Sequence, residues 1–308
     1  MRAVLVGAGL MGRWHAHAIR AVGTELVGVI DPDRTAAGRL GPALDDLEAA
    51  LALAPDVVHV CSPAGAHEAH ALQALRAGVH VVCEKPVAAT PSGTQKLLDA
   101  AAKAGVGLTP VHQFPFQDWR PLVDELGTVS AIEARICSAG TAEQPAALAG
   151  DIACHGLALF AHILGPSSLD GSWSARSLPG GQLHALGGGS VPLSLSVSLV
   201  GRPPRNELTV IGDRATLHAD LFHGFGTVDR GEGTTGKILR PLRSAVLGGG
   251  AATLNLARRA LRREPAFPGL RALVRAAHAA VAGGPPPLPP AHTLAVSRAR
   301  DAILRGGR

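Results

Sequence analysis

The stretch that decides the fold is Gly7-Ala8-Gly9-Leu10-Met11-Gly12, close to the start of the chain. It follows a short apolar run, Ala3–Val6, and precedes a segment with helical periodicity. Glycine at the first, third and sixth positions permits a tight turn, close approach of the backbone to a diphosphate, and close packing of helix on strand. The N–H groups that open the helix offer hydrogen bonds to phosphate oxygens. We therefore expect Gly7, Gly9, Leu10, Met11 and Gly12 to bind a dinucleotide cofactor.

Short apolar segments alternate with helix-like segments over the first 110 residues. The strand-like segments are Ala3–Val6, Leu26–Ile30, Val57–Cys61, Val79–Cys83 and Val106–Thr109. Two helix-like segments, Glu68–Ala77 and Pro91–Ala104, are each followed by a glycine, as helix C-termini commonly are. Apolar strands that alternate with helices are typical of a parallel sheet covered on both faces. The pattern predicts a doubly wound α/β domain with the Rossmann fold over residues 1–111.

The pattern changes after Val111, so we expect a second domain of the α+β class over residues 112–308. Residues 223–250 are rich in glycine and basic residues and are expected to form loops. A proline tract at residues 285–290 predicts a stiff connector to the last helix. The expected helices are Leu122–Leu126, a segment between Gly150 and Gly165, Leu254–Arg263, Leu270–Val281 and 292–305; the expected strands are Val129–Cys137, Val191–Val200 and Leu208–Asp220, the last with a hairpin turn at Gly212-Asp213.

Composition limits the class of protein. The chain has 308 residues, of which 46% are hydrophobic and 17% are charged, and this argues against intrinsic disorder. Aromatic residues make up only 3%, so a protein that stacks bases or sugar rings on aromatic side chains is not expected. Residues 201–308 carry 17 basic and 7 acidic side chains, but no nucleic-acid motif accompanies this excess. We expect a small-molecule substrate, and neither nucleic acid nor a membrane as partner.

The cysteines and the lengths of the apolar runs indicate the cellular compartment of the protein. Cys61, Cys83, Cys137 and Cys154 show no CxxC spacing, so we expect reduced thiols and neither disulfides nor a zinc site. No apolar run reaches 18 residues, and nothing resembling a signal-peptide cleavage site follows the N-terminal strand. A soluble, cytoplasmic protein without a metal is expected.

Asp31 ends the second strand, 24 residues after Gly7. A carboxylate at this position accepts hydrogen bonds from the ribose hydroxyls of an adenosine and repels a 2′-phosphate, which favours NAD over NADP. Asp31 is also compatible with a simple turn in Asp31-Pro32-Asp33, and Arg34 lies near enough to receive a 2′-phosphate. NAD is the expected cofactor, and NADP is the alternative.

Two more loops follow strands of the predicted parallel sheet. Ser62-Pro63-Ala64-Gly65-Ala66-His67 follows the third strand, and Cys83-Glu84-Lys85-Pro86 follows the fourth. Loops at the carboxyl ends of parallel strands line the ligand crevice. We therefore expect Ser62, Pro63, His67, Glu84 and Lys85 to lie at the cofactor. The alternative for Lys85 is a surface lysine in a turn.

The second half supplies candidate acid–base residues. Asp151 and His155 are four residues apart, hence on one face of a helix, where a carboxylate can hold and tune a general base. A half-buried histidine with a capping aspartate is the alternative. His162 lies on the same face, and a metal site of these three residues is conceivable but lacks a further ligand. Candidate substrate contacts are His112, Gln113, Gln117 and His162.

The glycine turn, the loop of residues 62–67 and Glu84-Lys85-Pro86 together resemble the Gfo/Idh/MocA oxidoreductases, the family of glucose–fructose oxidoreductase and inositol 2-dehydrogenase. The resemblance implies that Lys85 lies beside the nicotinamide and binds the reacting substrate oxygen, with a Lys85–Pro86 bond that is commonly cis. It implies that Asp151 and His155 match an Asp-x-x-x-His of the family, with His155 as proton acceptor and Asp151 orienting or charge-balancing the pair.

The resemblance also implies the architecture of the second domain. In relatives this domain is an open, mostly antiparallel sheet, often used for dimer or tetramer contacts, and the last helix commonly returns to the first domain. We therefore expect a homodimer or homotetramer formed through the C-terminal sheet. Two departures stand out. Ala158 replaces a further Asp, and Gln113 and Pro115 stand where relatives often carry Asn and Arg, which disfavours a charged or strongly polyhydroxylated sugar.

The leading hypothesis is an NAD(P)-dependent dehydrogenase or reductase. It transfers a hydride between nicotinamide and a carbinol or carbonyl carbon of a small sugar, cyclitol or related substrate. Alternatives within enzymes are a C=N or C=C reductase and a redox-neutral enzyme with tightly bound NAD. The alternative outside enzymes is a catalytically inactive cofactor-binding scaffold.

Overall fold

The computed structural model describes residues 1–138, 145–230 and 234–307. It divides into two compact units. The first unit comprises Met1–His112 and Leu270–Arg298, and the second comprises Gln113–Gly269 and Ala299–Arg308. The last helix, α9 (Pro290–Gly306), therefore contributes to both units.

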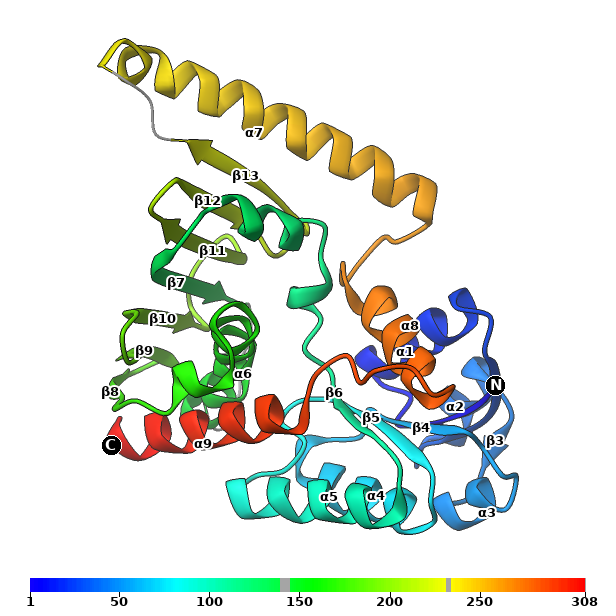
Figure 1. Ribbon diagram of the computed structural model, residues 1–308. Coiled ribbons are helices and arrows are strands. Elements are labelled where there is room, and N and C mark those ends of the chain that lie inside the picture. Colours follow the sequence, from blue (N-terminus) through cyan, green and yellow to red (C-terminus); the bar gives the residue numbers. More distant parts are fainter. Residues whose placement is uncertain (139–144, 231–233, 308) are drawn as a thin grey trace. The chain divides into compact units, whose positions relative to one another are not determined.

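The first unit is built on a six-stranded parallel sheet with the strand order β3-β2-β1-β4-β5-β6 (Figure 1). This is the order of a Rossmann fold, and it reverses direction between β1 and β4. The predicted doubly wound parallel sheet is confirmed. The strands are β1 (Arg2–Val6), β2 (Glu25–Ile30), β3 (Ala43–Leu44), β4 (Val57–Val60), β5 (His80–Cys83) and β6 (Leu108–Pro110). The helices are α1 (Leu10–Ala21), α2 (Arg34–Leu40), α3 (Leu47–Leu51), α4 (Ala64–Arg76), α5 (Pro91–Ala104) and α8 (Leu270–Val281).

Helices cover both faces of this sheet. On one face, α3, α4 and α5 bury Leu75 and Leu97 against strand residues such as Val58. On the other face, α1 and α8 pack on each other and on the strands, with Ile19 and Leu273 fully buried. Because both faces are covered, all four residues of β4 are buried, which explains why this strand is a continuous apolar run with one histidine.

The ends of α5 show how local sequence fixes an element. Thr90 precedes the helix, and its hydroxyl oxygen accepts a 3.1 Å hydrogen bond from the N–H of Gly93. Pro91 occupies the first turn, where no intrahelical N–H bond is lost. Gly105 ends the helix at a φ of 68°, in the left-handed region that glycine adopts without strain. The predicted bounds of this helix are confirmed.

The second unit is built on a seven-stranded sheet with the order β13-β12-β11-β7-β10-β9-β8. Every neighbouring pair is antiparallel except β7 and β10, so the predicted mostly antiparallel sheet is confirmed. The strands are β7 (Val129–Cys137), β8 (Ser174–Leu178), β9 (Gln182–Gly187), β10 (Leu193–Ser198), β11 (Arg205–Gly212), β12 (Ala215–Asp220) and β13 (Phe225–Arg230). The helices are α6 (Pro145–Leu164) and α7 (Thr234–Arg262), with short 3-10 helices η1 (Phe114–Phe116), η2 (Arg120–Glu125) and η3 (Pro166–Leu169).

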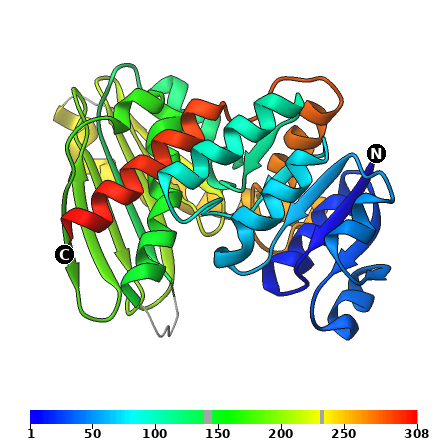
Figure 2. The same ribbon diagram turned by 90° about the horizontal axis from the view of Figure 1, so that it is seen from below.

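Helix α6 covers one face of this sheet. Gly156 permits the approach, because a Cβ there would lie 2.4 Å from the side chain of Leu195 in β10. The C-terminal part of α9 lies beside α6, with Leu304 against Gly150 (Figure 2). By length and composition α6 could cross a membrane, but 56% of its apolar window is buried inside this unit. This degree of burial is that of a core helix.

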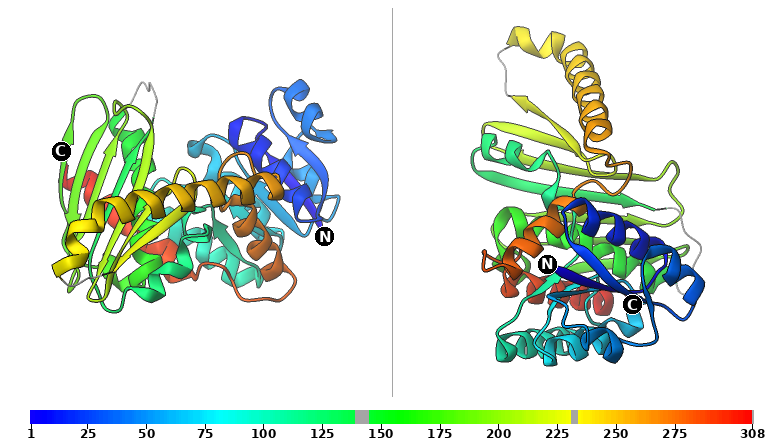
Figure 3. Two further views of the ribbon diagram at one scale, coloured as in Figure 1. Left: turned by 90° about the horizontal axis from the view of Figure 1, so that it is seen from above. Right: turned by 90° about the vertical axis from the view of Figure 1, so that its right-hand side faces the viewer.

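The expectation that residues 223–250 form loops is wrong. Residues 225–230 form β13, and α7 then runs for 29 residues beside it (Figure 3). Pro241 and three consecutive glycines, 248–250, lie inside this helix and account for the error, because both residue types disfavour helix interiors. Contacts far along the chain hold the helix in place. Arg240 pairs with Asp229 at 2.7 Å, and the amide of Asn255 donates to the carbonyl oxygen of His223 at 3.0 Å.

Trp119 offers a test of the packing of the second unit. It is fully buried, and its Nε1 donates a 2.7 Å hydrogen bond to Oε1 of Gln117. Trp119→Ala should lower the free energy of unfolding by about 3–5 kcal/mol, because it leaves a cavity. Trp119→Phe should cost about 1–3 kcal/mol, since a buried acceptor on Gln117 is left without its donor. Urea unfolding followed by circular dichroism measures both. The exposed Arg135→Ala is the control, and a loss as small as the control's in Trp119→Ala would contradict the prediction.

Candidate functional site

The glycine turn lies at the carboxyl end of β1, where it brings α1 against the strand. Gly7 adopts a φ of 101°, and a Cβ on Gly12 would lie 2.0 Å from the carbonyl oxygen of Gly7. Gly9 precedes α1, and no side chain caps the N–H groups of the first turn. Leu10 and Met11 begin the helix, with Leu10 59% exposed. The turn therefore offers helix N–H groups to an anion, and a larger residue at Gly7 or Gly12 would collide with backbone.

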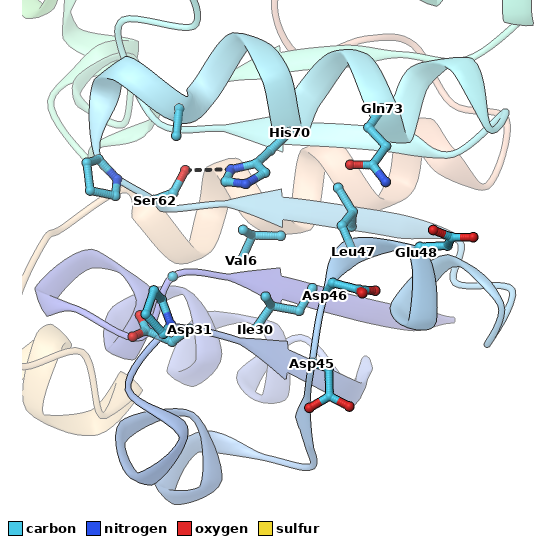
Figure 4. Close-up of a pocket in the computed structure, with 14 residues that line it drawn as sticks. Val6, Ile30, Asp31, Asp45, Asp46, Leu47, Glu48, Ser62, His70 and Gln73 are labelled. Atoms are coloured by element: carbon cyan, nitrogen blue, oxygen red, sulfur yellow. Dashed lines mark hydrogen bonds between the residues drawn. The ribbon is translucent and has the colours of Figure 1, made fainter.

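A cavity of about 560 Å3 opens beside this turn (Figure 4). Gly7, Asp31, Ser62 and Pro63 line it, as the sequence predicts, together with His70 and Gln73 of α4. Asp31 accepts hydrogen bonds from the N–H of Ala8 at 2.6 Å and from the N–H of Asp33 at 2.9 Å. Its carboxylate therefore couples the end of β2 to the glycine turn. The cavity has the features expected of an adenosine site: it lies beside the glycine turn, Gly7 lines it, and the carboxylate of Asp31 faces it.

Three further acidic residues line the same cavity and were not assigned by the sequence analysis. They are Asp45, Asp46 and Glu48, at and before the start of α3 (Figure 4). Arg34, the candidate partner of a 2′-phosphate, forms an ion pair with Asp45. Four carboxylates in one cavity disfavour an additional phosphate, because like charges close together raise the free energy. No local signal distinguishes these residues from an ordinary polar loop.

His67 ties two loops of the first unit together. It is buried, with Nε2 at 2.7 Å from the carbonyl oxygen of Ser62 and Nδ1 at 2.8 Å from that of Pro86. The hydroxyl of Ser62 is bonded to Nδ1 of His70 at 3.0 Å. Since both ring nitrogens of His67 face protein carbonyl groups, the residue positions the loops after β4 and β5.

Lys85 follows β5 at the same edge of the sheet, and the Lys85–Pro86 peptide bond is cis. Its side chain is half-buried. His112 and His292 are both buried, with ring centroids 6.0 Å apart. Burial lowers the pKa of His112 well below its ordinary value of 6.5, and the nearby charges of His292 and Lys85 lower it further. His112 is therefore a neutral imidazole near Lys85. His292, in α9, was not predicted, because it lies 180 residues further along the chain.

A chain of buried polar side chains leads away from Glu84. Nε2 of His15 lies 3.2 Å from Oε1 of Glu84, and Nδ1 of His15 lies 2.9 Å from Nδ1 of His59. Nε2 of His59 lies 2.9 Å from Nε2 of His278, whose Nδ1 lies 2.9 Å from Oγ1 of Thr24.

One arrangement of protons satisfies every contact in this chain. With the carboxylate of Glu84 accepting, His15 donates from Nε2 and accepts at Nδ1. His59 then donates from Nδ1 and accepts at Nε2, and His278 donates from Nε2 and accepts the Thr24 hydroxyl at Nδ1. All three rings are then neutral. Burial lowers the pKa of His59 well below 6.5 and that of His278 to about 4.

In the second unit, α6 carries the predicted acid–base residues on one face. Asp151, His155 and His162 are half-buried, and Ala158 between them is fully buried. The carboxylate of Asp151 accepts a 2.6 Å hydrogen bond from Arg300 of α9, a partner that the sequence did not predict. The ring of His155 lies 4.8 Å from the ring of Phe114, and that of His162 lies 6.2 Å from the ring of Phe116. Phe114 and Phe116 thus each place an aromatic ring beside one of these histidines.

The two glutamines near η1, which the sequence analysis proposed as substrate contacts, are both buried in the second unit. Gln117 is buried, and both hydrogens of its amide are used by the carbonyl oxygens of Leu221 and Pro268, at 2.8 and 3.1 Å. Its oxygen accepts from Trp119. Gln113 is also buried, and its backbone packs against Gly269. Gln117 therefore holds the fold of the second unit. In the described part of the chain, no three His, Cys, Asp or Glu side chains could together hold a metal ion.

A known protein family matches the N-terminal part of the chain, which forms most of the first unit. The family described as "Oxidoreductase family, NAD-binding Rossmann fold", GFO_IDH_MocA, matches residues 1–112. Residues 1–112 therefore match the NAD-binding domain of the Gfo/Idh/MocA oxidoreductases. This confirms the resemblance and the nicotinamide cofactor predicted from the sequence. The glycine turn, the uncapped start of α1 and the cavity at Asp31 fit that cofactor.

Curated relatives match the same part of the chain. D-glucoside 3-dehydrogenase of Escherichia coli (strain K12) is 40% identical over 114 residues, which are 34% of this chain and 32% of the relative. Inositol 2-dehydrogenase 4 of Saccharopolyspora erythraea is 38% identical over 120 residues, 36% of each chain. In both cases the match spans about a third of the relative's length.

Solved structures match over the whole chain. The WlbA dehydrogenase from Bordetella pertussis, in complex with NADH and UDP-GlcNAcA, is 19% identical with a TM-score of 0.78, covering 100% of this chain and 95% of that one. GenD2 from gentamicin A biosynthesis, in complex with NAD, is 22% identical with a TM-score of 0.77, covering 100% and 94%. At these identities the similarity establishes the fold.

The histidine chain predicts how stability depends on pH. In the folded protein His59 stays neutral well below pH 6.5 and His278 stays neutral down to about pH 4, whereas the unfolded chain protonates both as the pH falls through 6.5. Stability should therefore be greatest above pH 7 and fall as the pH drops from 7 towards 4, by up to about 1.4 kcal/mol per pH unit for each group.

The variant His278→Gln tests the origin of this slope. It should unfold more readily at pH 7, since it disturbs the bond to His59, and it should show a shallower slope between pH 7 and 4. Urea unfolding at a series of pH values measures both effects, and the exposed His17→Gln is the control. An unchanged slope in His278→Gln would assign the pH dependence to other groups.

The acidic cavity predicts a preference for NADH. The carboxylates at Asp31 and Asp45 should make NADH bind at least about tenfold more tightly than NADPH, a difference of about 1.4 kcal/mol. Asp31→Ser should narrow the gap, and Asp31→Ser with Asp45→Ala should narrow it further because Arg34 is released. Fluorescence titration of both cofactors decides this, with the exposed Asp99→Ser as control. Equal affinities in the wild type, or a preference for NADPH, would overturn the assignment.

Proposed function

We propose that this protein is an NAD(P)-dependent oxidoreductase that transfers a hydride between nicotinamide and a carbinol or carbonyl carbon of a small sugar, cyclitol or related substrate. The observation that carries the proposal is the placement of Lys85. It follows β5 at the same carboxyl edge of the sheet as the glycine turn, Asp31 and Ser62, and it has the neutral imidazole of His112 nearby. A cationic donor at this edge is suited to hold an oxygen that becomes negatively charged.

In the first unit, each residue has a distinct task in this proposal. The turn from Gly7 to Gly12 and the start of α1 bind the diphosphate, and Asp31 binds the adenosine ribose. When bound, the nicotinamide supplies or accepts the hydride. The ammonium group of Lys85 holds the substrate oxygen, and the buried Glu84 and its histidine chain position the segment that carries Lys85.

In the second unit, His155 is the proposed acceptor of the proton of the substrate hydroxyl. General catalysis of this kind contributes about 100-fold to 10,000-fold to the rate. Asp151 is tied to Arg300 by a 2.6 Å hydrogen bond, so this pair stiffens the face of α6 that carries His155. His162, one turn beyond the buried Ala158, is a proposed substrate contact.

The proposed substrate class follows from the residues and from the relatives. The names of the curated relatives, a D-glucoside 3-dehydrogenase and an inositol 2-dehydrogenase, support a polyhydroxylated ring. The rings of Phe114 and Phe116, beside His155 and His162, offer an apolar face to the carbon skeleton of such a ring.

We further propose that the enzyme works in the cytoplasm as a homo-oligomer. All four cysteines are free thiols, and burial raises the pKa of the Cys83 and Cys61 thiols well above the ordinary value, which keeps them unreactive. Free, buried thiols are typical of a reducing compartment.

Substitution of Lys85 and His155 tests the proposed roles. Once a panel of sugars and cyclitols yields a substrate, Lys85→Met and His155→Gln should each lower kcat/KM by about 100-fold or more. NADH affinity should change little in His155→Gln. Absorbance of NADH at steady state measures turnover, and its net accumulation excludes a redox-neutral reaction.

Matched controls separate these roles from general damage. Lys96→Met removes a lysine that pairs with Glu68 on the surface, and His17→Gln removes an exposed histidine. Both controls should keep full activity. Full turnover in Lys85→Met or His155→Gln would refute the assigned role, and a wild type that binds NADH but turns over no substrate would favour a scaffold.

A further inference from the structure

The outer face of α7 is the largest concentration of exposed apolar side chains in the described parts of the chain. Of thirteen exposed large apolar residues, eight lie on this helix. Ile238, Leu239, Leu242, Val246, Leu256 and Leu261 are each 65 to 85% exposed. Exposed apolar patches of this kind mark interaction sites in soluble proteins.

These residues follow a regular pattern along the helix. Leu239, Leu242, Val246, Gly249, Thr253 and Leu256 are spaced alternately by three and four residues, and all six are exposed. This is the spacing of the seam between two paired helices. At 100° per residue the seam lies opposite the buried Asn255, which faces the second unit. The helix therefore packs on its own unit with one side and presents a complete seam with the other.

The three glycines in the middle of α7 have no function within the unit. A Cβ on Gly248, Gly249 or Gly250 would meet no atom within 4 Å. Glycine is unfavourable in a helix interior, so these residues weaken the helix without any gain from packing. Small residues at the centre of a seam allow a second helix backbone to approach closely. This gain exists only if a partner helix crosses at that point.

The seam is symmetric about a point between Leu247 and Gly248. In an antiparallel pair centred there, Leu239 faces Leu256 of the other helix, Leu242 faces Thr253, and Val246 faces Gly249. A two-fold axis requires this kind of self-complementary surface. We propose that α7 pairs antiparallel with α7 of a second copy of this chain and crosses it beside Gly249.

The seam offers apolar surface to a partner. Four of its side chains, Leu239, Leu242, Val246 and Leu256, are apolar and 65 to 69% exposed. The uncovered face of the sheet, which the sequence analysis expected to form the oligomer, is more polar. Ser194, Ser196 and Ser198 of β10 lie on it, with Leu186 beside Ser194.

The positive charge of α7 is compatible with a second copy. Residues 234–263 carry seven basic side chains and no acidic one. However, Arg240 pairs with Asp229, Arg262 pairs with Asp118, and Arg259 donates to backbone carbonyl groups of the same unit. The second unit thus neutralises part of the charge itself, and no charged residue occupies the seam. An anionic membrane would give the three glycines no role.

Sedimentation velocity of the full chain over a wide range of concentrations tests the proposal. The wild type should dimerise, and Leu256→Glu should raise the dimer Kd by about 100-fold or more, because it places a charge in an apolar seam. Leu186→Glu is the matched control: this leucine is 61% exposed, close to the 69% of Leu256, but lies on the sheet. Circular dichroism and NADH binding should be unchanged in both variants.

Two further measurements test the geometry. Gly249→Leu should weaken dimerisation by about tenfold or more, although leucine favours helix, so the monomer should not lose thermal stability. A mixture of Leu242→Cys and Thr253→Cys proteins should form an intermolecular disulfide under mild oxidation, while neither variant alone does so, as expected only for antiparallel helices.

Several outcomes would overturn the proposal. A wild type that stays monomeric at all concentrations excludes it, and co-sedimentation of that monomer with phosphatidylglycerol vesicles would assign α7 to a membrane surface. A dimer that is broken by Leu186→Glu and not by Leu256→Glu would assign the interface to the sheet. Self-crosslinking of either cysteine variant alone would make the helices parallel. None of these outcomes bears on Lys85 or His155, so the proposed function is tested separately.

Discussion

The close approach of Gly7 and Gly12 is the constraint on which the first unit depends. With a Cβ of Gly12 only 2.0 Å from the oxygen of Gly7, the start of α1 lies directly against the end of β1. The N–H of Gly7 donates to Ile30 and that of Ala8 to Asp31, so the turn also fixes the end of β2. Two strand ends and a helix start are thus joined at one edge. The uncapped start of α1 and the position of the Asp31 carboxylate follow from this single contact.

Helix α1 also connects the glycine turn to buried residues of the first unit. His15 lies one turn beyond Gly12 and contacts both Glu84 and His59. Because Glu84 precedes Lys85, this buried side chain connects the Lys85 segment to the helix that begins at the glycine turn. A fixed order of donors and acceptors satisfies the buried imidazoles of this chain of contacts. His67 provides a second link, from the loop after β4 to Pro86. Two histidines therefore set the geometry of the Lys85 segment.

Local signals were sufficient to predict much of this protein. The glycine turn, the bounds of α5 and the alternation in β10 each depend on neighbouring residues, and each was predicted correctly. Contacts between distant segments were not accessible. His278 meets His59 across 219 positions, and Arg300 meets Asp151 across 149, and no local pattern marks either residue. The prediction for α7 was wrong because a local signal was misleading. Pro241 and three glycines predict a break in the helix, but contacts with Asp229 and His223 outside the helix stabilise it.

The division of the chain into units has a consequence for its synthesis. The first unit needs Leu270–Arg298, which leave the ribosome only after the whole of Gln113–Gly269 has been made. At about 5–20 residues per second, this delay is roughly 10–30 s. Throughout it, the side of the sheet that α8 will cover, including His59, lacks its final layer. The nascent protein thus exposes an apolar surface for many seconds, a period in which binding by a chaperone competes with aggregation.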